Sequence, residues 1–431
     1  MRKYYFIALI IALLALAACG VTDRNGQVYT SATYLNNQPH ETPSPTEPPA
    51  PCSATRYMLD ENKHEQEYEY PLYDPPPPCE ADIWIAGLTL REKIGQLIMP
   101  RLPWQTTILS PAQRDWFTSY PVGGIILFSD NMYSIQQVQA LTMELQAASR
   151  HTLFIATDEE GGRVSRVGRL FADGDFSILP AYEIGRTGDP DMAYTTGRII
   201  GERLLSLGIN MNFAPVADVW TNPANTVIGN RSFGSNPVIV GEMVDATVRG
   251  LNSAGVLSTI KHFPGHGDTY EDSHYLLAVY PHDRERFDYI EALPFIRGIE
   301  AGTHAVMMGH IATPQLQNPT VPLYWMEPWL MSGTLPATFS DFWVQDVLRG
   351  EMGFDGLVIT DALEMRALSD HFTPGQIALG AFVAGVDILL MPTDITATFD
   401  ALIEGFYNGV FDEERLHESL RRIFWARQFR Y

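Results

Sequence analysis

Short apolar runs alternate with longer amphipathic stretches from residue 81 onward, and this alternation constrains the fold more than any other feature of the chain. Each run is rich in Ile, Val, Leu and Met on both faces, as expected of strands that helices cover on both sides. Eight runs occur, at 96–100, 124–128, 153–157, 209–213, 256–261, 305–309, 356–361 and 387–392. Strands that alternate with helices in this way predict a parallel sheet.

Eight strand and helix units in about 350 residues favour an α/β protein of the (β/α)8 barrel type with long loops. An open, doubly wound sheet is the alternative, because a count of strands does not establish that the sheet closes. Of the 431 residues, 45% are hydrophobic and 19% are charged, so the chain can bury a core of the required size. We therefore predict one TIM-type barrel domain over residues 81–431.

The chain is strongly acidic. Its 29 Lys and Arg residues stand against 51 Asp and Glu residues, which gives a formal net charge of −22. This sign disfavours nucleic acid as a partner, because the phosphate backbone is also negative. The three cysteines, at positions 19, 52 and 79, provide neither a disulfide scaffold nor a thiolate zinc site for the barrel.

Residues 1–18 have the pattern of a secretion signal. Two cationic residues precede fifteen uncharged ones (4–18), which at ~1.5 Å per residue fall short of a hydrocarbon core about 30 Å thick. The segment 16–20 resembles the bacterial lipoprotein box, in which Cys19 becomes lipidated after cleavage. An ordinary signal peptide with an incidental Cys19 is the alternative. We expect the chain to be anchored to a membrane by lipid without spanning it.

Residues 19–80 are predicted to form an extended extracytoplasmic linker. Eleven of the chain's 30 prolines lie between Pro39 and Pro78, among Thr, Ser, Asn and Glu. Such a composition buries too little apolar area to offset its ordering entropy, and it favours polyproline II. Cys52 and Cys79 could form a disulfide in an oxidising exterior, and two free thiols are the alternative.

Polar residues gather where the predicted strands end. In a barrel the carboxyl ends of the strands line the active site, so these residues are the candidates for function. They are Asp158–Arg166 after the third run, Asp218 and Arg231 after the fourth, Lys261–His274 after the fifth, His310 after the sixth and Asp361 after the seventh.

Structural roles compete with catalytic ones at these positions. Asp361 by itself could cap the following helix, because Asp is a preferred N-cap residue. The histidines of residues 262–274 have spacings that a metal site permits. Pro264 and neighbouring glycines, however, deny them the helix that such a site requires. We therefore expect neither a metal nor a cofactor.

Four strings stand at the predicted strand ends: DEEGGRVSR (158–166), NRSFG (230–234), KHFPGHGDTYEDSH (261–274) and GFDGLVITDALEM (353–365). Together they resemble glycoside hydrolase family 3, and within it the β-N-acetylhexosaminidase branch that removes N-acetylglucosamine. The resemblance spans residues 85–395 and implies a (β/α)8 barrel. The sequence ends at Tyr431 without room for the second α/β domain of many β-glucosidases of the family, so we expect the single-domain hexosaminidase type.

The resemblance implies that Asp361 is the nucleophile and His274 the general acid/base, with Asp272 orienting His274. A carboxylate near cations such as Lys261 and Arg166 should stay ionised and able to attack an anomeric carbon. A retaining mechanism then passes through a covalent glycosyl-enzyme that water hydrolyses. An imidazole with an unperturbed pKa of about 6.5 can donate and recover the proton near working pH.

Five further positions match residues that hydrogen-bond the sugar in this family: Asp158, Arg166, Arg231, Lys261 and His262. Charged groups suit this role, because their hydrogen bonds are stronger than those between neutral groups. The sequence departs from the family pattern twice. Glu159 stands where Gln is common, and Ala362 stands where many members have a second Asp. These departures put the sugar preference in doubt rather than the activity.

The sequence thus predicts an extracytoplasmic, lipid-anchored exo-β-N-acetylglucosaminidase that acts as a monomer on cell-wall (peptidoglycan) or chitin-derived fragments. The alternatives are a family 3 glycosidase for other sugars, a phosphorylase that uses phosphate in place of water, and an inactive lipid-anchored wall-binding protein. We expect the aromatic segment 321–331 to pack onto the barrel rather than to stack on sugars. Met307 and Met308 are expected to belong to the barrel core.

Overall fold

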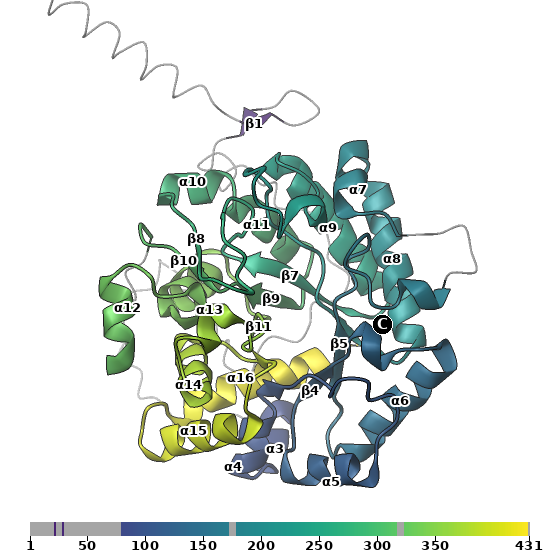
Figure 1. The fold of residues 1–431 in the computed structure, drawn as a ribbon, viewed down its shortest axis with the longest axis vertical. Helices are drawn as coiled ribbons and strands as arrows, with labels where there is room; N and C mark the ends of the chain where they lie inside the picture. The colour runs from purple at the N-terminus through teal and green to yellow at the C-terminus, as the bar shows by residue number, and fades with distance from the viewer. Residues whose placement is uncertain (1–20, 23–27, 30–78, 172–177, 317–322, 430–431) are drawn as a thin grey trace, which may run out of the picture.

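The computed structural model describes residues 21–22, 28–29, 79–171, 178–316 and 323–429 (Figure 1). The predicted signal segment, Cys19 and most of the predicted linker lie outside these residues. Within the linker, β1 (Val21–Thr22) and β2 (Val28–Tyr29) pair as short antiparallel strands.

The described chain resumes at Cys79, directly before α3 (Glu80–Ala86). Cys79 is disulfide-bonded. Its partner lies outside the described residues, so the pairing with Cys52 stays a prediction. Across the described ranges, no helix combines the length and the apolar character that a membrane span needs.

Each of the eight predicted runs contains a strand. These strands are β3 (Ile98–Met99), β4 (Gly124–Ile126), β5 (Phe154–Thr157), β6 (Met211–Asn212), β7 (Leu257–Phe263), β9 (Ala305–Met308), β11 (Leu357–Thr360) and β12 (Leu389–Leu390). Six of them form a parallel sheet in the order β11-β9-β7-β6-β5-β4, and β12 pairs in parallel with β3.

Two isolated parallel bridges, Arg101–Ile126 and Ile359–Ile388, join the β12-β3 pair to the two edges of the six-stranded sheet. The sheet is therefore curled, and its strands follow one another in chain order. A doubly wound sheet would reverse that order at a switch point, so this alternative is wrong. The chain has a TIM-like α/β fold.

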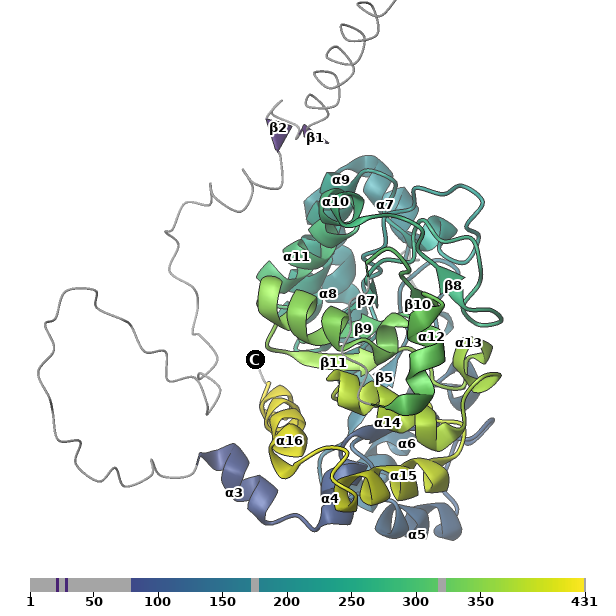
Figure 2. The ribbon, with the colours of Figure 1, turned by 90° about the vertical axis from the view of Figure 1, so that its left-hand side faces the viewer.

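Helices cover the outside of the curled sheet (Figures 1 and 2). They are α4 (Leu90–Gly95), α5 (Pro111–Ser119), α6 (Ile135–Ala148), α7 (Ala181–Thr187), α8 (Pro190–Ser206), α9 (Pro237–Ser253), α10 (Arg284–Tyr289), α11 (Ala292–Glu300), α12 (Glu327–Met331), the π-helix η6 (Phe342–Glu351), α13 (Arg366–Ser369), α14 (Pro374–Ala384), α15 (Ile395–Tyr407) and α16 (Glu413–Arg427). Thr89, Ser110 and Thr373 start their helices with capping boxes. The last helix, α16, lies against α3 and β11.

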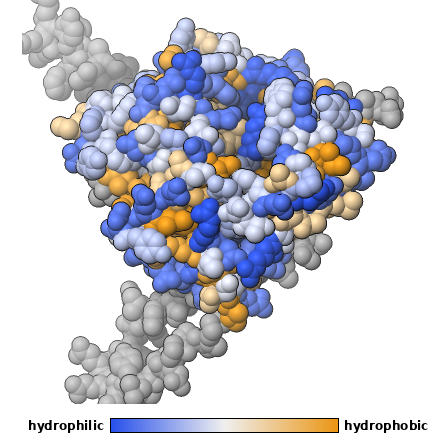
Figure 3. Space-filling view, turned by 60° about the horizontal axis from the view of Figure 1, so that its bottom comes forward, coloured by the Kyte–Doolittle hydropathy of each residue, from blue (hydrophilic) through white to orange (hydrophobic). Residues whose placement is uncertain are grey.

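Shorter elements surround the carboxyl ends of the strands. Two strands, β8 (Ala278–Val279) and β10 (Ile311–Ala312), pair in parallel there. Single 3₁₀ turns are η1 (Ser129–Asn131), η2 (Gly168–Phe171), η3 (Gly229–Arg231), η4 (Tyr324–Met326) and η5 (Ala337–Phe339). The face in Figure 3 is mostly hydrophilic, with apolar residues in small separate patches.

The described part of the aromatic segment packs onto the fold, as predicted. The rings of Trp325 and Trp329 lie 5.5 and 4.8 Å from the ring of Phe372, centroid to centroid, while Tyr324 is exposed. Met308 is buried in the core, as expected. Met307 is also buried, but it lines the cavity described below, so its assignment to the core alone was incomplete.

Asp387 connects several elements at the amino-terminal end of the sheet. Its carboxylate is fully buried and accepts hydrogen bonds from Arg349 (2.8 Å), Arg422 (3.0 Å), Ser419 (2.6 Å) and the backbone N–H of Val358 (2.9 Å). Burial raises the pKa of Asp387, but the surrounding arginines outweigh burial and hold the pKa below its usual range. The carboxylate therefore ties β11, η6 and α16 together.

We expect Asp387→Ala to lower the free energy of unfolding by about 3 to 5 kcal/mol, because it leaves buried guanidinium groups without their counter-ion. Urea-induced unfolding of the full chain measures the change. Glu183→Ala, which breaks an exposed ion pair with Arg186, is the matched control and should cost less than about 1 kcal/mol. Equal losses in the two variants would contradict the role given to Asp387.

Candidate active site

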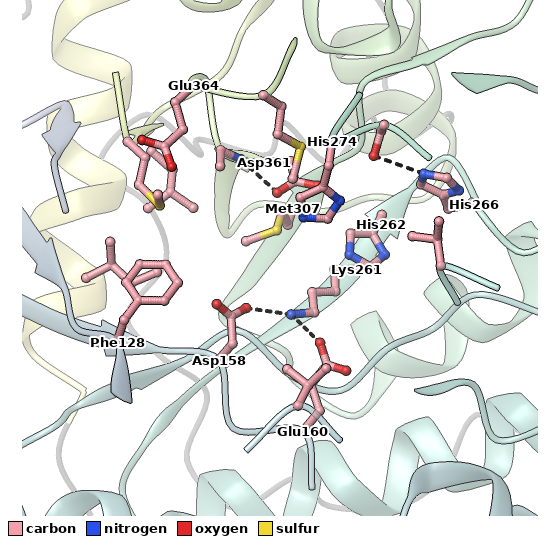
Figure 4. A pocket seen from close by; sticks show the side chains of 18 of the residues that line it. Phe128, Asp158, Glu160, Lys261, His262, His266, His274, Met307, Asp361 and Glu364 are labelled. Atoms are coloured by element: carbon pink, nitrogen blue, oxygen red, sulfur yellow. Dashed lines mark hydrogen bonds and ion pairs between the residues drawn. The ribbon is translucent and has the colours of Figure 1, made fainter. Parts of the chain in front are cut away.

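A cavity of about 450 Å³ opens at the carboxyl ends of the strands. Seven of the eight residues predicted to act in catalysis or sugar binding line it: Asp158, Arg166, Arg231, Lys261, His262, His274 and Asp361 (Figure 4). Asp272 does not line the cavity and reaches it through His274. Other lining residues include Arg101, Phe128, Glu160, His266, Met307 and Glu364.

Asp361 directly follows β11, and its backbone N–H donates to the carbonyl of Met308 at 2.9 Å. The side chain is buried, and its Oδ1 accepts a hydrogen bond from the N–H of Ala362 at 2.7 Å. Burial raises the pKa of Asp361, but the neighbouring His262 and His310 and the Ala362 N–H outweigh it. The pKa therefore lies below its usual range, and the carboxylate is ionised at neutral pH.

The residues that keep Asp361 ionised differ from those expected. From the sequence, Lys261 and Arg166 were expected to keep Asp361 ionised. In the structure, the Nζ of Lys261 lies 2.7 Å from Oδ1 of Asp158 and 2.7 Å from Oε1 of Glu160. The Nη2 of Arg166 lies 4.0 Å from Oδ2 of Asp158. Both cations thus pair with carboxylates other than Asp361.

Asp158, Glu160, Arg231 and Lys261 form one charge network along the cavity wall, and Figure 4 shows Lys261 between Asp158 and Glu160. Arg231, on η3, donates from Nε and Nη2 to the two carboxylate oxygens of Glu160, each at 2.8 Å. Burial raises the pKa of Glu160, but Arg231 and Lys261 outweigh it and lower the pKa well below its usual range. Burial lowers the pKa of Lys261, and its two carboxylate partners outweigh that effect and raise it. Glu160, Arg231 and Lys261 are therefore charged.

No role was predicted for Glu160, and Glu159 was noted only as a departure from the family pattern. Glu159 is buried and accepts hydrogen bonds from Ser165 Oγ (2.6 Å) and from the N–H groups of Arg166 (2.6 Å) and Val167 (2.8 Å). Its side chain orders the loop and does not line the cavity. Alternate residues at a strand end point to opposite sides, so Asp158 in the cavity was a signal for Glu160 rather than Glu159.

His262 is oriented by Asp218, another residue that received no role. The Nδ1 of His262 lies 2.7 Å from Oδ2 of Asp218, which is fully buried. Because a carboxylate only accepts, Nδ1 carries the proton in this contact. The Nε2 of His262 lies 3.4 Å from Nη2 of Arg231, at the cavity. Asp218 and His262 are 44 positions apart in the chain, so the spacing of residues in the sequence could not reveal that they pair.

His266 lies beside His262 but is turned toward its own loop. Its Nδ1 is 2.6 Å from Thr269 Oγ1, and its Nε2 is 3.1 Å from Ser273 Oγ. Burial, assisted by His262, lowers the pKa of His266 to about 4, so the ring is neutral at neutral pH. In the part of the chain that the structure describes, no three His, Cys, Asp or Glu side chains are arranged to hold a metal ion.

His274 and Asp272 form a pair at the cavity rim. The Nδ1 of His274 lies 2.8 Å from Oδ1 of Asp272, and the same oxygen accepts the backbone N–H of His274 at 2.9 Å. The two side chains are 56% and 36% exposed, in contrast to the buried Asp361. The carbonyl of His274 accepts a hydrogen bond from the N–H of Arg366 at 3.3 Å, which links the rim to the loop after Asp361.

His310 supports the segment that follows Asp361. Its Nε2 lies 3.0 Å from the carbonyl of Ala362, and its Nδ1 lies 2.7 Å from Thr338 Oγ1. A carbonyl only accepts, so Nε2 carries the proton. Burial lowers the pKa of His310. Sequence analysis placed His310 at a strand end but gave it no function.

A buried network holds the base of the loop that carries His274. The hydroxyl of Tyr280 donates to Oε2 of Glu291 at 2.6 Å, and both side chains are buried. Asp268 is paired with His282 and accepts a hydrogen bond from Thr221 Oγ1 at 2.6 Å. Burial raises the pKa of Glu291 to about 7 despite the hydrogen bond from Tyr280.

The raised pKa of Glu291 makes stability depend on pH. A carboxyl with a pKa of about 7 when folded, against 4.5 ordinarily, stabilises the fold below pH 4.5 and loses that contribution as pH rises through 7. We expect the wild type to lose about 3 kcal/mol relative to Glu291→Gln between about pH 4.5 and pH 8. Denaturant unfolding of both proteins at several pH values measures it. A pH-independent difference would contradict the assignment.

Comparison with known proteins adds context to this site. A family model described as "Glycosyl hydrolase family 3 N terminal domain" matches residues 89–426. The chain is 39% identical over 335 residues to beta-hexosaminidase A of Pseudoalteromonas piscicida, a match that covers 74% of this chain and 55% of that protein. It is 35% identical over 305 residues to a beta-hexosaminidase of Hydrogenovibrio crunogenus, covering 69% of this chain and 79% of the relative.

Several solved structures are also similar to this chain. A glycoside hydrolase family 3 beta-N-acetylglucosaminidase from Paenibacillus sp. str. FPU-7 matches with a TM-score of 0.72 and 40% identity, covering 79% of this chain and 62% of that one. A beta-N-acetylhexosaminidase from Beutenbergia cavernae matches with a TM-score of 0.69 and 28% identity, and the match covers 80% of this chain and 99% of that one. A beta-glucoside phosphorylase, BglX, matches with a TM-score of 0.69 and 27% identity, and the match covers 80% of this chain and 60% of that one. The chain thus spans little more than half the length of several relatives.

Proposed function

The chain belongs to glycosyl hydrolase family 3, and on that basis we propose that it is a retaining exo-β-N-acetylglucosaminidase. The observation that carries the proposal is the presence, at one cavity, of a buried ionised carboxylate, Asp361, and an imidazole paired with a carboxylate, His274 with Asp272. The relatives named beta-hexosaminidase and beta-N-acetylglucosaminidase support the choice of sugar.

In the first step, a carboxylate oxygen of Asp361 attacks the anomeric carbon as the glycosidic bond breaks. His274 gives a proton to the leaving oxygen. Because Nδ1 of His274 faces Asp272, this proton comes from Nε2 of the imidazolium, whose charge Asp272 stabilises. The products are a covalent glycosyl-enzyme and the free leaving group.

In the second step, neutral His274 takes a proton from a water molecule, whose oxygen attacks the same carbon. The bond to Asp361 breaks and its carboxylate is restored. Two inversions return the sugar in its original configuration. His274 is protonated again and ready for the next turnover.

The charge network supplies the groups that hold the terminal sugar. Asp158 and Lys261 offer an acceptor and a donor beside each other, and His262 presents Nε2 to the same space. Charge-assisted hydrogen bonds to sugar hydroxyls are about twice as strong as neutral ones. Arg231 and Arg166 complete the set assigned from the sequence.

We also infer that the sheet closes as a (β/α)8 barrel, which the bridges at both edges support. The substrates would be fragments of cell wall or chitin with terminal N-acetylglucosamine, cleaved outside the cytoplasmic membrane by a lipid-anchored monomer. The signal-like segment 1–18 and the proline-rich linker motivate this location.

The first test is hydrolysis of nitrophenyl glycosides and of the neutral disaccharide N,N′-diacetylchitobiose by the full chain. We expect cleavage of the N-acetylglucosaminide but not the glucoside. Asp361→Ala should lower kcat/KM at least about a thousandfold. His274→Ala should lower it roughly a hundredfold or more on the disaccharide. The loss should be smaller on nitrophenyl substrates, because nitrophenolate leaves without protonation. His417→Ala, on α16 away from the cavity, is the matched control.

Other outcomes would redirect the proposal. Binding of N-acetylglucosamine without turnover would favour the wall-binding alternative. Turnover that requires inorganic phosphate and yields a sugar phosphate would favour a phosphorylase, the activity named for one structural neighbour. Preference for the glucoside would exclude the N-acetyl specificity.

Lipid attachment is tested separately. When the full chain is expressed in a bacterial host, we expect it in the membrane fraction, and Cys19→Ala should release it into the soluble extracytoplasmic fraction. Cys52→Ala is the matched control and should stay with the membrane. Identical fractionation of all three proteins would contradict lipidation at Cys19.

A further inference from the structure

The loop that carries His274 joins β7 to β8 and spans residues 264–277. Its middle faces solvent, with Tyr270 and Tyr275 both exposed. The side-chain partner of His274 is Asp272, which belongs to the same loop, so the pair moves with the loop. Both His274 and Asp361 line the cavity (Figure 4). The place of His274 relative to Asp361 therefore depends on how the two ends of the loop are held.

A group of polar side chains, which we call the stem network, joins these two ends. One member comes from the first end of the loop, two directly follow β8, two come from α10 and the start of α11, and one comes from the loop after β6. In that order they are Asp268, Tyr280, His282, Arg286, Glu291 and Thr221.

Asp268 is the centre of the stem network. Its Oδ1 accepts a hydrogen bond from Thr221 Oγ1 at 2.6 Å and lies 3.4 Å from Nη2 of Arg286. Its Oδ2 is paired with Nε2 of His282. The Nη2 of Arg286 also donates to Thr221 Oγ1 at 3.0 Å. Asp268 and His282 are 14 positions apart, with His274 between them, so their contact closes the loop at its base.

Glu291 makes a second tie between the two ends. Its Oε2 accepts the hydroxyl of Tyr280 at 2.6 Å, and its Oε1 lies 3.5 Å from Nη2 of Arg286. It also packs against Gly265 at the first end of the loop, where a Cβ would lie 2.7 Å from Cγ of Glu291. Gly265 has φ +131°, a conformation that other residues rarely adopt. The side chain of Glu291 thus contacts both ends.

Such a network fixes geometry more than it adds stability. Buried ion pairs often contribute little compared with well-packed apolar side chains, whereas the directions of their hydrogen bonds select one arrangement. Proton transfer needs that precision, because the donor must come within about 2.6–3.2 Å of the leaving oxygen. The six side chains of the stem network do not line the cavity, so any effect on the reaction passes through the loop.

We propose that the stem network positions His274 for proton transfer, and that Asp268 holds the two ends of the loop together for this purpose. This inference rests on the proposed glycosidase function. Its members are positioning residues, since they act through His274 and not on the substrate. Loosening the network should therefore impair the steps in which His274 transfers a proton and leave the attack by Asp361 intact.

The test uses the full chain and Asp268→Asn, which removes the charge but keeps the shape. On N,N′-diacetylchitobiose we expect kcat/KM to fall about tenfold or more. On the dinitrophenyl glycoside of N-acetylglucosamine, whose leaving group needs no proton, kcat/KM should fall less than about twofold. The kcat on this glycoside should fall, because water still needs His274 as its base. Azide attacks without losing a proton, so it should restore kcat and yield the glycosyl azide.

Further variants show whether the effect passes through His274. In a His274→Ala background, Asp268→Asn should lower kcat/KM on the disaccharide by less than about twofold more. His282→Gln keeps an N–H donor for Asp268 and should retain more activity than His282→Ala. Asp245→Asn breaks an ion pair with Arg249 on α9 and is the matched control, because the Asp245 side chain is 18% exposed and that of Asp268 is 15% exposed. It should change neither substrate.

If the wild type cleaves neither substrate, the proposed function itself fails. If it cleaves both but Asp268→Asn lowers kcat/KM equally on the two and azide restores nothing, the network only stabilises the fold and the positioning role is overturned. Losses that multiply in the double variant would also overturn it, since Asp268 would then act by a route other than His274.

Discussion

The ammonium of Lys261, buried between the carboxylates of Asp158 and Glu160, is the interaction on which the site and much of the fold depend. A buried cation is tolerated only when its partners are all in place, because an unpaired charge costs several kcal/mol. Lys261 lies on β7, and both of its carboxylate partners follow the end of β5. Asp158 and Lys261 are 103 residues apart in the chain. Arg231 on η3 completes the network. The sheet order β7-β6-β5 brings these groups together at one end of the sheet.

This network also determines what surrounds Asp361, the proposed nucleophile. Because Lys261 and Arg231 are engaged by Asp158 and Glu160, they are held away from a direct ion pair with Asp361. Asp361 is instead surrounded by imidazoles and backbone N–H groups, which keep it ionised without a strong salt bridge. A salt-bridged carboxylate would have to break that pair before attacking carbon. The arrangement therefore leaves a charged group that is free to react.

Sequence patterns predicted the strands well, because each buried strand must be apolar on both faces. They also placed seven of the eight predicted site residues at the cavity, since strand ends converge in such a fold. They missed partnerships that depend on orientation or on distance in the chain. Glu160 received no role, and Asp218 pairs with His262 across 44 residues. Arg101 follows a two-residue strand, and the ring of Phe128, which lies 4.5 Å from its guanidinium carbon, comes from the next strand end along the chain.

The cavity thus combines two environments with different physical demands. The wall proposed to bind the terminal sugar is buried, and the ion pairs of Lys261 and Arg231 fix its groups so that they can discriminate hydroxyl positions. The rim, with His274 and Asp272, is exposed, so its imidazole remains close to solvent and can exchange protons between the two steps. A buried acid could not recover its proton from water as readily. Under the proposed function, selectivity for the sugar and turnover of the acid/base group require opposite degrees of burial, and the fold supplies both by placing one set on strand ends and the other on a loop.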